Sequence, residues 1–183
     1  MLHIIVDVFI CLLIADFVSG LGHWAEDTWG APGRSPLLDK WVILPNIEHH
    51  RRPGQMRNKS YWETNHVTVI LALVVLGGLL AFHVNAWQAY LTVALISQSN
   101  QIHKWAHSQT VPFWVRWLQR IGLLQSVAHH GEHHKRPYAY RFCTTTNLLN
   151  PVLDGTGFWH GLEWVIERCG ISVKRATEAR GGY

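Results

Sequence analysis

The sequence predicts an all-α integral membrane protein, with about three transmembrane helices and further amphipathic helices at the membrane interface. Apolar residues make up 48% of the 183 residues and charged residues only 15%, against roughly 25% charged residues in soluble domains. The ten Trp residues indicate the same environment, because Trp favours the boundary between lipid and water. The chain length suits one domain, which we expect to cover residues 1–183.

The first span is expected at residues 1–19, which are apolar except for His3, Asp7 and Asp16. Its length is just sufficient for a helix that crosses the hydrocarbon core, which needs about 20 residues. The segment lacks the basic start and the small-residue cleavage site of a secretory leader, so we expect a retained helix.

A helical hairpin is expected at residues 66–102. Val67–Phe82 carries no charged residue, and the apolar stretch Ala86–Ser97 follows a short polar break at residues 83–85. The whole stretch is too long for one span of about 20 residues and fits two short helices joined by a tight turn. A buried hairpin in a soluble protein is the alternative, which is disfavoured because so short a chain could not cover two wholly apolar helices.

The segments on either side of the hairpin carry most of the histidines. Residues 22–65 are expected to form a polar loop rich in Pro, Gly, Arg and Trp, and residues 103–170 hold further histidine motifs. Within the latter, Pro112–Leu124 and Gly157–Cys169 each collect apolar residues on one helical face, which is typical of a helix lying in the interface. Lys174–Tyr183 is expected to be a frayed tail.

The distribution of charge indicates which side of the membrane these segments occupy. All 16 Lys and Arg residues fall within Arg34–Lys59 or after Ile102, and none lies in the first span or in the hairpin. With three spans, both basic segments share one side, which the positive-inside tendency identifies as cytoplasmic, in a bacterial inner membrane or the endoplasmic reticulum. The net charge of +4 therefore does not require nucleic acid as a partner.

Histidine is the unusual feature of the composition, because the 13 His residues outnumber the 12 Asp and Glu residues. Spacings of three and four residues place side chains on one face of a helix. The motifs HxxxH at 103–107 and HxxHH at 130–134 can therefore each present imidazoles to one point. The adjacent pair His49 and His50 cannot do so from a regular helix unless each residue serves a different metal, which a two-metal centre would explain.

Eight histidines, all on the side that carries the basic residues, are the predicted metal ligands: His23, His49, His50, His103, His107, His130, His133 and His134. Three spans would bring them to one face, so the sequence predicts a histidine-rich di-metal site on the cytoplasmic face. Imidazole suits iron in such a site, as it does zinc and copper. We interpret His3, His66, His83 and His160 as polar surface residues, while His129 stays open because it adjoins HxxHH.

Other metal proteins fit this pattern less well. Residues 103–107 read HKWAH rather than HExxH, so a zinc protease would lack its general base. A metal transporter would carry ligands near the middle of its spans, and the hairpin has none there, although Asp7 and Asp16 keep this alternative open. A haem-binding anchor would leave most of the histidines without a role.

These motifs, in this order, resemble the lipid desaturase domain family, which includes animal plasmanylethanolamine desaturase and the plastid desaturase that makes a trans-3 double bond in phosphatidylglycerol. The resemblance covers most of the chain from residue 15 to residue 165. The matching segments are GHWAEDTWG at 22–30, EHH at 48–50, ETN at 63–65, HKWAH at 103–107, LQ at 118–119, HHGEHH at 129–134 and YRFCTTTNLLN at 140–150. Asn147 departs from the pattern, in which we expect Gly.

The resemblance implies two iron ions held by the eight histidines named above, with dioxygen as co-substrate. Zinc shares these ligand preferences and could replace iron in a purified sample. The resemblance also implies supporting roles for three other residues. Asp27, one helical turn after His23, is either a ligand or a residue that orients one, and Asn65 and Asn150 are weaker candidates for support.

The implied activity is desaturation of an alkyl or acyl chain of a membrane lipid, either an ether phospholipid, as in plasmalogen formation, or a lipid like phosphatidylglycerol. Electrons would come from a small electron-transfer protein that resembles cytochrome b5 or ferredoxin. The alternatives are a fatty-chain hydroxylase that uses the same centre and a metal-handling membrane protein that is not an enzyme. The basic residues Arg51, Arg52, Arg57 and Lys59 are candidates to hold a phosphate headgroup.

Overall fold

The computed structural model describes residues 2–33 and 35–173, which form helices and loops and contain no strand, so the all-α prediction is confirmed. The predicted tail at 174–183 lies outside the described residues. The helical elements, in chain order, are α1 (Leu2–Trp29), α2 (Pro36–Leu38), η1 (Asp39–Ile43), α3 (Leu44–Arg51), η2 (Pro53–Asn58), α4 (Tyr61–Ala81), α5 (Trp87–Ser97), α6 (Ser99–Ala106), α7 (Phe113–Arg120), α8 (Val127–His133), α9 (Leu149–Gly155) and α10 (Phe158–Arg168).

Helix α1 is longer than the first span that the sequence predicts. It continues through residue 19 to Trp29, so the region expected to be a polar loop from residue 22 begins as helix. Gly20 allows Cys143 to pack directly against α1, because a Cβ atom at this position would lie only 2.6 Å from Sγ of Cys143. The predicted end of the first helix near residue 19 was therefore wrong. Gly20 does not end the helix but allows another segment to approach it closely. His23 and Asp27 consequently project from the same continuous helix as the apolar segment.

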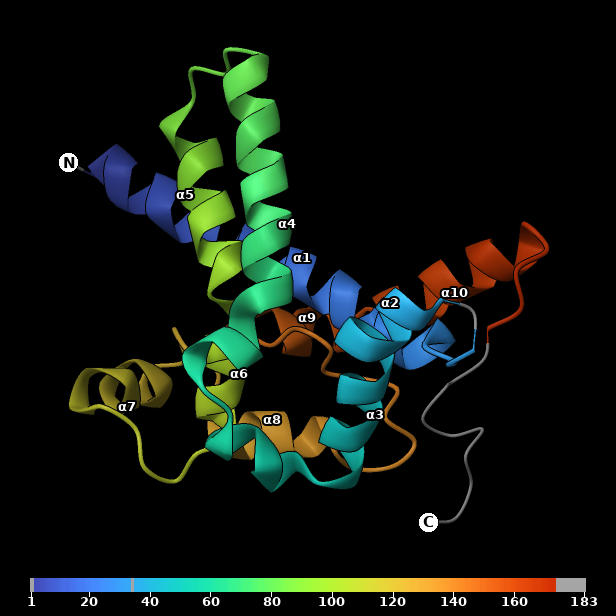
Figure 1. Ribbon diagram of the computed structural model, residues 1–183. Helices are drawn as coiled ribbons and strands as arrows, with labels where there is room; N and C mark the ends of the chain where they lie inside the picture. The colour runs from blue at the N-terminus through green and yellow to red at the C-terminus, as the bar shows by residue number, and fades with distance from the viewer. Residues whose placement is uncertain (1, 34, 174–183) are drawn as a thin grey trace.

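Helices α4 and α5 form the predicted hairpin and project away from the rest of the molecule, while α1 crosses near their base (Figure 1). Ser60 begins α4 with a capping box: its hydroxyl accepts from the backbone N–H of Glu63, whose carboxylate accepts from the N–H of Ser60. The turn follows Phe82, and His83 has a positive φ of 51° there. The hairpin thus starts at residue 61, slightly before the predicted boundary.

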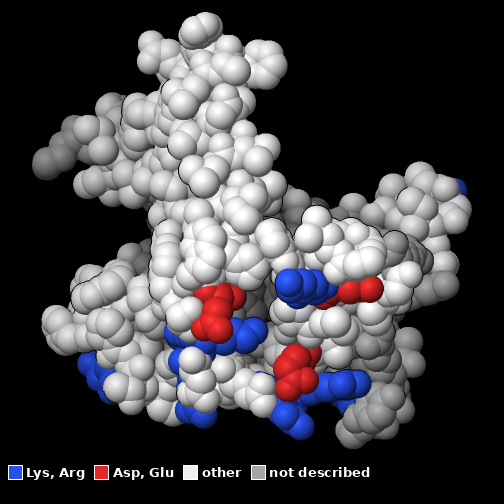
Figure 2. Space-filling model, in the orientation of Figure 1, with Lys and Arg blue, Asp and Glu red and all other residues white. Residues whose placement is uncertain are grey.

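Two of the described helices, α1 and α4, are long and apolar enough to cross a membrane. Helix α5 has 11 residues, so it extends only about 16 Å, roughly half the thickness of a hydrocarbon core. Figure 2 shows that the projecting part of α4 and α5 is free of charged residues, whereas the Lys, Arg, Asp and Glu residues gather mainly over the opposite part of this face. This separation is typical of a protein that sits partly in lipid.

The second half of the chain packs beneath the hairpin. Helix α8 lies beside α6, and α7 and α10 extend to opposite sides (Figure 1). A core cluster joins α1 to the C-terminal region through Trp24, Phe142, Cys143 and Trp159. The predicted amphipathic helices correspond to α7 and α10, and exposed aromatic rings on them include Trp117 and Trp164.

A non-helical segment, residues 140–146, packs against α1 between Asp16 and His23 and is here called the strap. The fully buried carboxylate of Asp16 accepts hydrogen bonds from the backbone N–H of Thr145 at 2.7 Å and from the hydroxyl of Thr146 at 2.6 Å. Farther along α1, Asp7 accepts from the side-chain amide of Gln88 on α5 at 2.9 Å. Both acidic residues of the first span therefore hold helices or loops together.

We predict that Asp16→Ala lowers the free energy of unfolding by about 1–3 kcal/mol, because it leaves two buried donors of the strap without an acceptor. Asp7→Ala is the matched control on the same helix, since its carboxylate is only partly buried and accepts a hydrogen bond from Gln88. Thermal unfolding in detergent measures both variants. Equal losses in the two would contradict a special role for the bond between Asp16 and the strap.

Candidate metal centre

The eight predicted histidines and Asp27 converge in two neighbouring sets of donor atoms. Within each set the candidate ligand atoms all lie within 4.8 Å of one another. We call the set of His23, Asp27, His50 and His133 site A. We call the set of His49, His103, His107, His130 and His134 site B.

Four helices and their C-caps supply these residues. Helix α1 contributes two donors of site A one turn apart, and α3 contributes His49 to site B and His50 to site A. Helix α6 and its C-cap provide His103 and His107, which share site B. The spacing of the histidines in the sequence predicts that His103 and His107 share one site. It also predicts that the adjacent His49 and His50 belong to different sites, as they do here.

Helix α8 divides its histidines in a way that spacing did not predict. His130 and its neighbour one turn later, His134, face site B, whereas His133 turns to site A. The HxxHH motif thus contributes to both sites instead of presenting all its imidazoles to one point. Ser126 caps the start of this helix by accepting from the N–H of His129 at 3.2 Å.

In site A, a carboxylate lies among three imidazoles. Oδ1 of Asp27 is 2.9 Å from Nε2 of His50, and its Oδ2 is 3.2 Å from Nε2 of His133 and 3.6 Å from Nε2 of His23. Asn46 on α3 also donates to Oδ1 of Asp27, at 2.9 Å. The donors thus approach one small volume from three helices, α1, α3 and α8.

Backbone carbonyls of the strap set the tautomers of two histidines in site A. Nδ1 of His23 is 3.1 Å from the carbonyl oxygen of Phe142, and Nδ1 of His133 is 2.8 Å from that of Tyr140. A carbonyl can only accept, so each Nδ1 carries a proton and each Nε2 faces Asp27, where it can offer its lone pair to a metal ion. This is the arrangement by which proteins orient metal-binding histidines.

In site B, the Nε2 atoms of four imidazoles face one another. Nε2 of His130 is 2.8 Å from that of His103 and 3.0 Å from that of His134, and Nε2 of His107 is 3.3 Å from that of His103. Neither ring nitrogen of His49, the fifth member, has a hydrogen-bond partner, and both are buried. Such an arrangement offers several lone pairs to one point.

Burial, reinforced by the neighbouring imidazoles, keeps the histidines of site B neutral. The pKa values of His49, His103 and His130 lie well below the usual range, and that of His107 is lowered to about 4. Neutral imidazole is the form that binds a metal ion, because protonation removes the lone pair. The set is therefore ready to bind a cation at neutral pH.

The donor chemistry of both sites fits metal ions better than it fits a hydrogen-bonded core. Buried polar atoms are almost always hydrogen-bonded, yet five buried imidazole nitrogens here, besides the two of His49, have no hydrogen-bond partner. Opposed lone pairs repel one another unless a cation lies between them. The two sites are also adjacent, since the rings of His49 and His50 are 5.4 Å apart and those of His50 and His134 are 5.1 Å apart. Two nearby ions are what this arrangement can hold.

Asn150 and His129, which the sequence left with minor or open roles, support the strap. The Asn150 side chain accepts from the N–H of Cys143 at 3.0 Å and donates to its carbonyl at 2.8 Å. It also contacts Nε2 of His129 at 3.1 Å, so this histidine faces away from the donor sets. Through Cys143, Asn150 holds the carbonyl of Phe142 that orients His23.

Asn65 lies elsewhere. It is fully buried on α4, where its amide donates to the carbonyl of Tyr61 at 2.8 Å and contacts Gln101 on α6 at 3.4 Å. The contact with Gln101 fastens α4 to the helix that carries His103, so the support that Asn65 gives to the centre is indirect. Sequence reasoning missed Gln125, which donates to the carbonyl of Cys143 at 2.6 Å, and no motif could have revealed it. Asp16 did have a signal, as an acid in an apolar segment.

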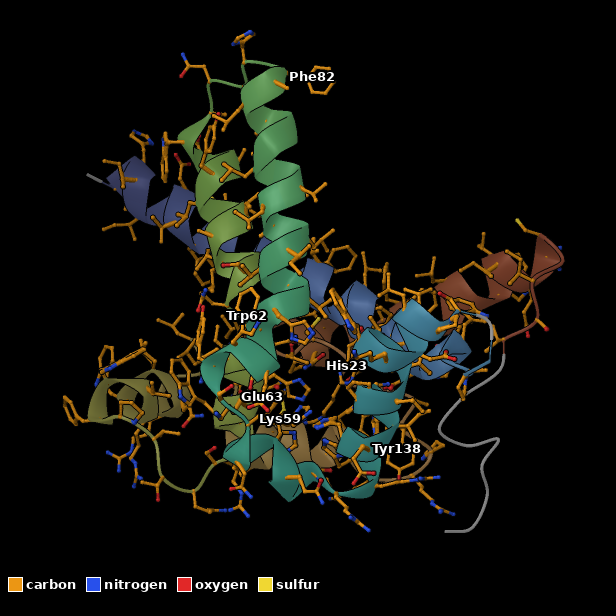
Figure 3. The ribbon with its side chains drawn as sticks, in the orientation of Figure 1. His23, Lys59, Trp62, Glu63, Phe82 and Tyr138 are labelled. Carbon is orange, nitrogen blue, oxygen red and sulfur yellow. The ribbon has the colours of Figure 1, made fainter. Side chains whose placement is uncertain are left out.

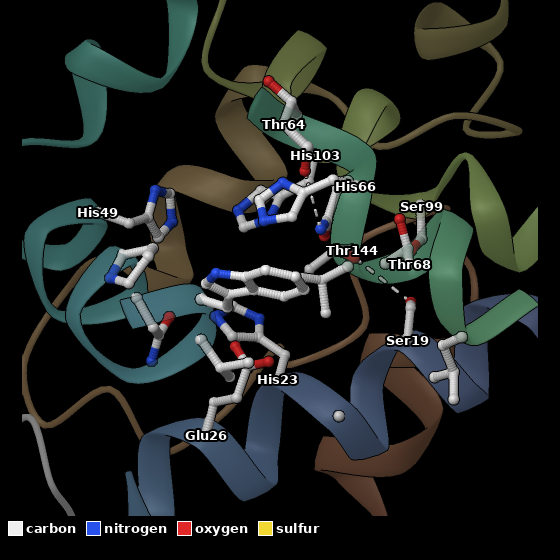
Figure 4. Close-up of a pocket in the computed structure, with 18 of the residues that line it drawn as sticks. Ser19, His23, Glu26, His49, Thr64, His66, Thr68, Ser99, His103 and Thr144 are labelled. Carbon is white, nitrogen blue, oxygen red and sulfur yellow. Dashed lines mark hydrogen bonds between the residues drawn. The ribbon is translucent and has the colours of Figure 1, made fainter. Parts of the chain in front are cut away.

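A pocket of about 260 Å³ opens beside the donor sets. His23, His49 and His103 form one wall, and Ser19, Thr68 and Thr144 lie on other sides of it (Figure 4). Both metal sites therefore border a space that a small part of another molecule can enter.

Asn147, where we expected Gly, is not among the residues that line this pocket. Its side chain accepts a hydrogen bond from the N–H of Ser126 at 3.0 Å and so holds the start of α8.

Comparison with known proteins gives a consistent result. The chain is 34% identical to mouse plasmanylethanolamine desaturase 1, over 97% of this chain and 70% of that protein. It is 33% identical to a plasmanylethanolamine desaturase of Myxococcus xanthus, over 84% of this chain and 57% of that protein. With the chloroplastic fatty acid desaturase 4-like 2 of Arabidopsis thaliana the identity is 30%, over 91% of this chain and 61% of the relative. No solved structure matches the chain.

The relatives are thus named as desaturases, which are oxidoreductases, and the chain spans 57–70% of the length of these three. The family model described as the lipid desaturase domain matches residues 12–176, which include every residue of sites A and B. The predicted resemblance is confirmed: the chain belongs to the lipid desaturase domain family.

Proposed function

We propose that this protein is a dioxygen-dependent desaturase that introduces a double bond into an alkyl or acyl chain of a membrane lipid. The observation that carries the proposal is the pair of adjacent, convergent donor sets in a chain of the lipid desaturase domain family. The substrate class is an ether phospholipid or a lipid like phosphatidylglycerol. The names of the mouse and bacterial relatives favour the ether phospholipid.

The overall reaction balances with one dioxygen molecule, two electrons and two protons. Two adjacent carbons of the lipid chain each lose one hydrogen atom, a carbon–carbon double bond forms, and dioxygen is reduced to two water molecules. Two iron ions bound in sites A and B would supply the one-electron chemistry with dioxygen that attacks an unactivated C–H bond. Zinc in the same positions would bind the donors but could not supply the electrons.

The residues of the chain bind and orient the ions. With eight imidazoles and only one carboxylate as donors, two bound iron ions would keep a large net positive charge, which favours an oxidising site. Asp27 contributes the single negative charge in the two sets, and the strap carbonyls keep His23 and His133 in the metal-binding tautomer. Asn150 and Asp16 act as positioning residues through the strap.

We propose that the electrons come from a small electron-transfer protein that resembles cytochrome b5 or ferredoxin. Support comes from the exposed basic side chains of Arg52 on the α3 side and Lys135 after α8. Arg57 also acts electrostatically on His107 of site B. Basic residues around a metal centre attract an acidic partner and speed its association.

We further propose that the centre lies on the cytoplasmic side of the membrane, with α5 returning the chain through the bilayer as a third, short span. The support is the distribution of basic residues, all of which lie in the segments that carry the donor sets or beyond them. Helix α6 follows α5 after a single intervening residue and extends its path, so the two together approach the length of a span.

Product analysis separates desaturation from hydroxylation. We predict that purified protein with iron, dioxygen and a reductant gives a lipid that has lost the mass of two hydrogen atoms, measured by mass spectrometry. A gain of one oxygen atom would instead identify the hydroxylase alternative, in which oxygen is transferred to the chain. Iron that is bound but never consumes oxygen in the presence of reductant would identify a metal-handling protein.

We predict that His107→Ala and His133→Ala each lower product formation at least about 100-fold, because each removes a donor from a different site. Metal analysis should show less iron per chain in both variants, with membrane insertion intact. His83→Ala, in the hairpin turn, is the matched control and should keep full activity. Full activity in either site variant would contradict the assignment of that site.

A further inference from the structure

The pocket beside the donor sets has walls of different polarity, which bears on the substrate of the proposed reaction. Along α4, Glu63, Val67 and Leu71 line it at intervals of four residues, so they share one face of the helix over about 12 Å. The end near Glu63 also contains Lys59, and the other end contains Ile96 of α5. One end of the pocket therefore suits a polar group and the other an apolar chain.

The apolar end opens onto surface that would contact lipid. Val18 of α1 and Leu71 of α4 both line the pocket, and they remain 38% and 54% exposed. Both belong to the two helices that are apolar enough to cross a membrane. A lipid chain could thus pass from the bilayer into the pocket between α1 and α4 without crossing water.

The polar end lies at the depth of the interface. Trp41 lines the pocket and, like Trp62, contacts the ring of the lining residue His66; both Trp side chains remain exposed, and Trp is typical of the boundary between lipid and water. Lys59 is the one lysine or arginine among the described residues that line the pocket. Figure 3 shows Lys59, Glu63 and His23 together near the base of α4, whereas Phe82 marks its far end. The wall formed by His23, His49 and His103, here called the metal wall, therefore lies at the same level as the polar end.

The volume limits what the pocket encloses. About 260 Å³ is below the roughly 300–1,000 Å³ of pockets that enclose a whole drug-sized ligand, so an entire phospholipid cannot fit. Only the part of a lipid around its headgroup junction can lie inside, while the remainder of the chain stays against α1 and α4. The bond that faces His23, His49 and His103 is then one close to the headgroup.

We propose that this pocket binds a phospholipid laterally from the membrane, with its phosphate beside Lys59 and the first carbons of one chain between the metal wall and Val67. This inference rests on the proposed function and adds to it the substrate's binding site, orientation and reactive end. A lysine binds phosphate as a point charge, which tolerates different groups attached to that phosphate. The pocket therefore selects the position of the bond more strongly than the headgroup.

Gly22 provides a direct test of the pocket. It lines the cavity, and a Cβ atom placed on it would meet no atom within 4 Å, so a larger side chain would enter empty space. Gly77 of α4 is equally open but lies outside the pocket. Gly22→Leu should block the cavity while iron content stays at the wild-type value, and Gly77→Leu is the matched control.

The readout is photo-crosslinking in the absence of reductant, with iron-loaded protein in phosphatidylcholine nanodiscs. The probe is a phospholipid that carries a diazirine on the first carbons of one chain, and labelled peptides are mapped by mass spectrometry. We expect labelling of the α4 segment around Val67 in wild type and in Gly77→Leu, and at least a tenfold loss in Gly22→Leu. Val67→Phe is a second blocking variant if Gly22→Leu loses iron.

Lys59→Met tests the orientation of the lipid, with the exposed Lys40→Met as its control outside the pocket. We expect about threefold weaker labelling in Lys59→Met, in line with a partly exposed charge pair, and no change in Lys40→Met. A probe that lacks the phosphate should label both variants equally. Suppression of the phospholipid signal by inorganic phosphate would show a free-anion site instead and overturn this orientation.

Labelling and turnover distinguish the two proposals. Pocket labelling that Gly22→Leu abolishes, without lipid oxidation in any condition, would sink the desaturase function and support the lipid site. Lipid desaturation at the wild-type rate by iron-loaded Gly22→Leu would support the function and overturn the site. Labelling spread evenly over the outer faces of α1 and α4 would also overturn it.

Discussion

The convergence of nine electron-rich donor atoms in one buried region is the constraint on which this structure depends. Neutral imidazoles and a carboxylate that face one another gain nothing from burial by themselves, because their lone pairs repel and lose hydration. Packing and hydrogen bonds elsewhere must hold them in place. The cluster of Trp24, Phe142 and Trp159 and the bonds of the strap supply that support. Metal ions would convert the repulsion into binding energy.

The strap connects the membrane part of the protein with the metal centre. Its far end is fastened to Asp16 in the apolar part of α1, and its near end presents the carbonyls that orient His23 and His133. Asn150 and Gln125 fix the middle through Cys143. A change in the apolar part of α1 can therefore alter the geometry of the donors without touching any of them, so this helix both carries the long apolar segment and helps to position the donor sets.

The position of the centre follows from where the long helices end. Helix α1 delivers donors on its last turns, and α6 delivers them as it continues from the hairpin. The pocket between these elements is apolar toward the exposed faces of α1 and α4 and polar toward the opposite end. We propose that such a site meets a lipid at the junction of its chain and its headgroup, because that is where the protein itself changes from apolar to polar.

The sequence by itself determined the helical hairpin, the eight histidines and the pairing of His103 with His107, because helical periodicity and hydrophobic length are local properties. It also anticipated that His49 and His50 would belong to different donor sets. Only the tertiary structure decided that His133 leaves its neighbours for site A and that Asp27 joins it. The extension of α1 past Gly20 was likewise decided by packing against Cys143. These outcomes depend on contacts between segments more than 100 residues apart, which no local spacing encodes.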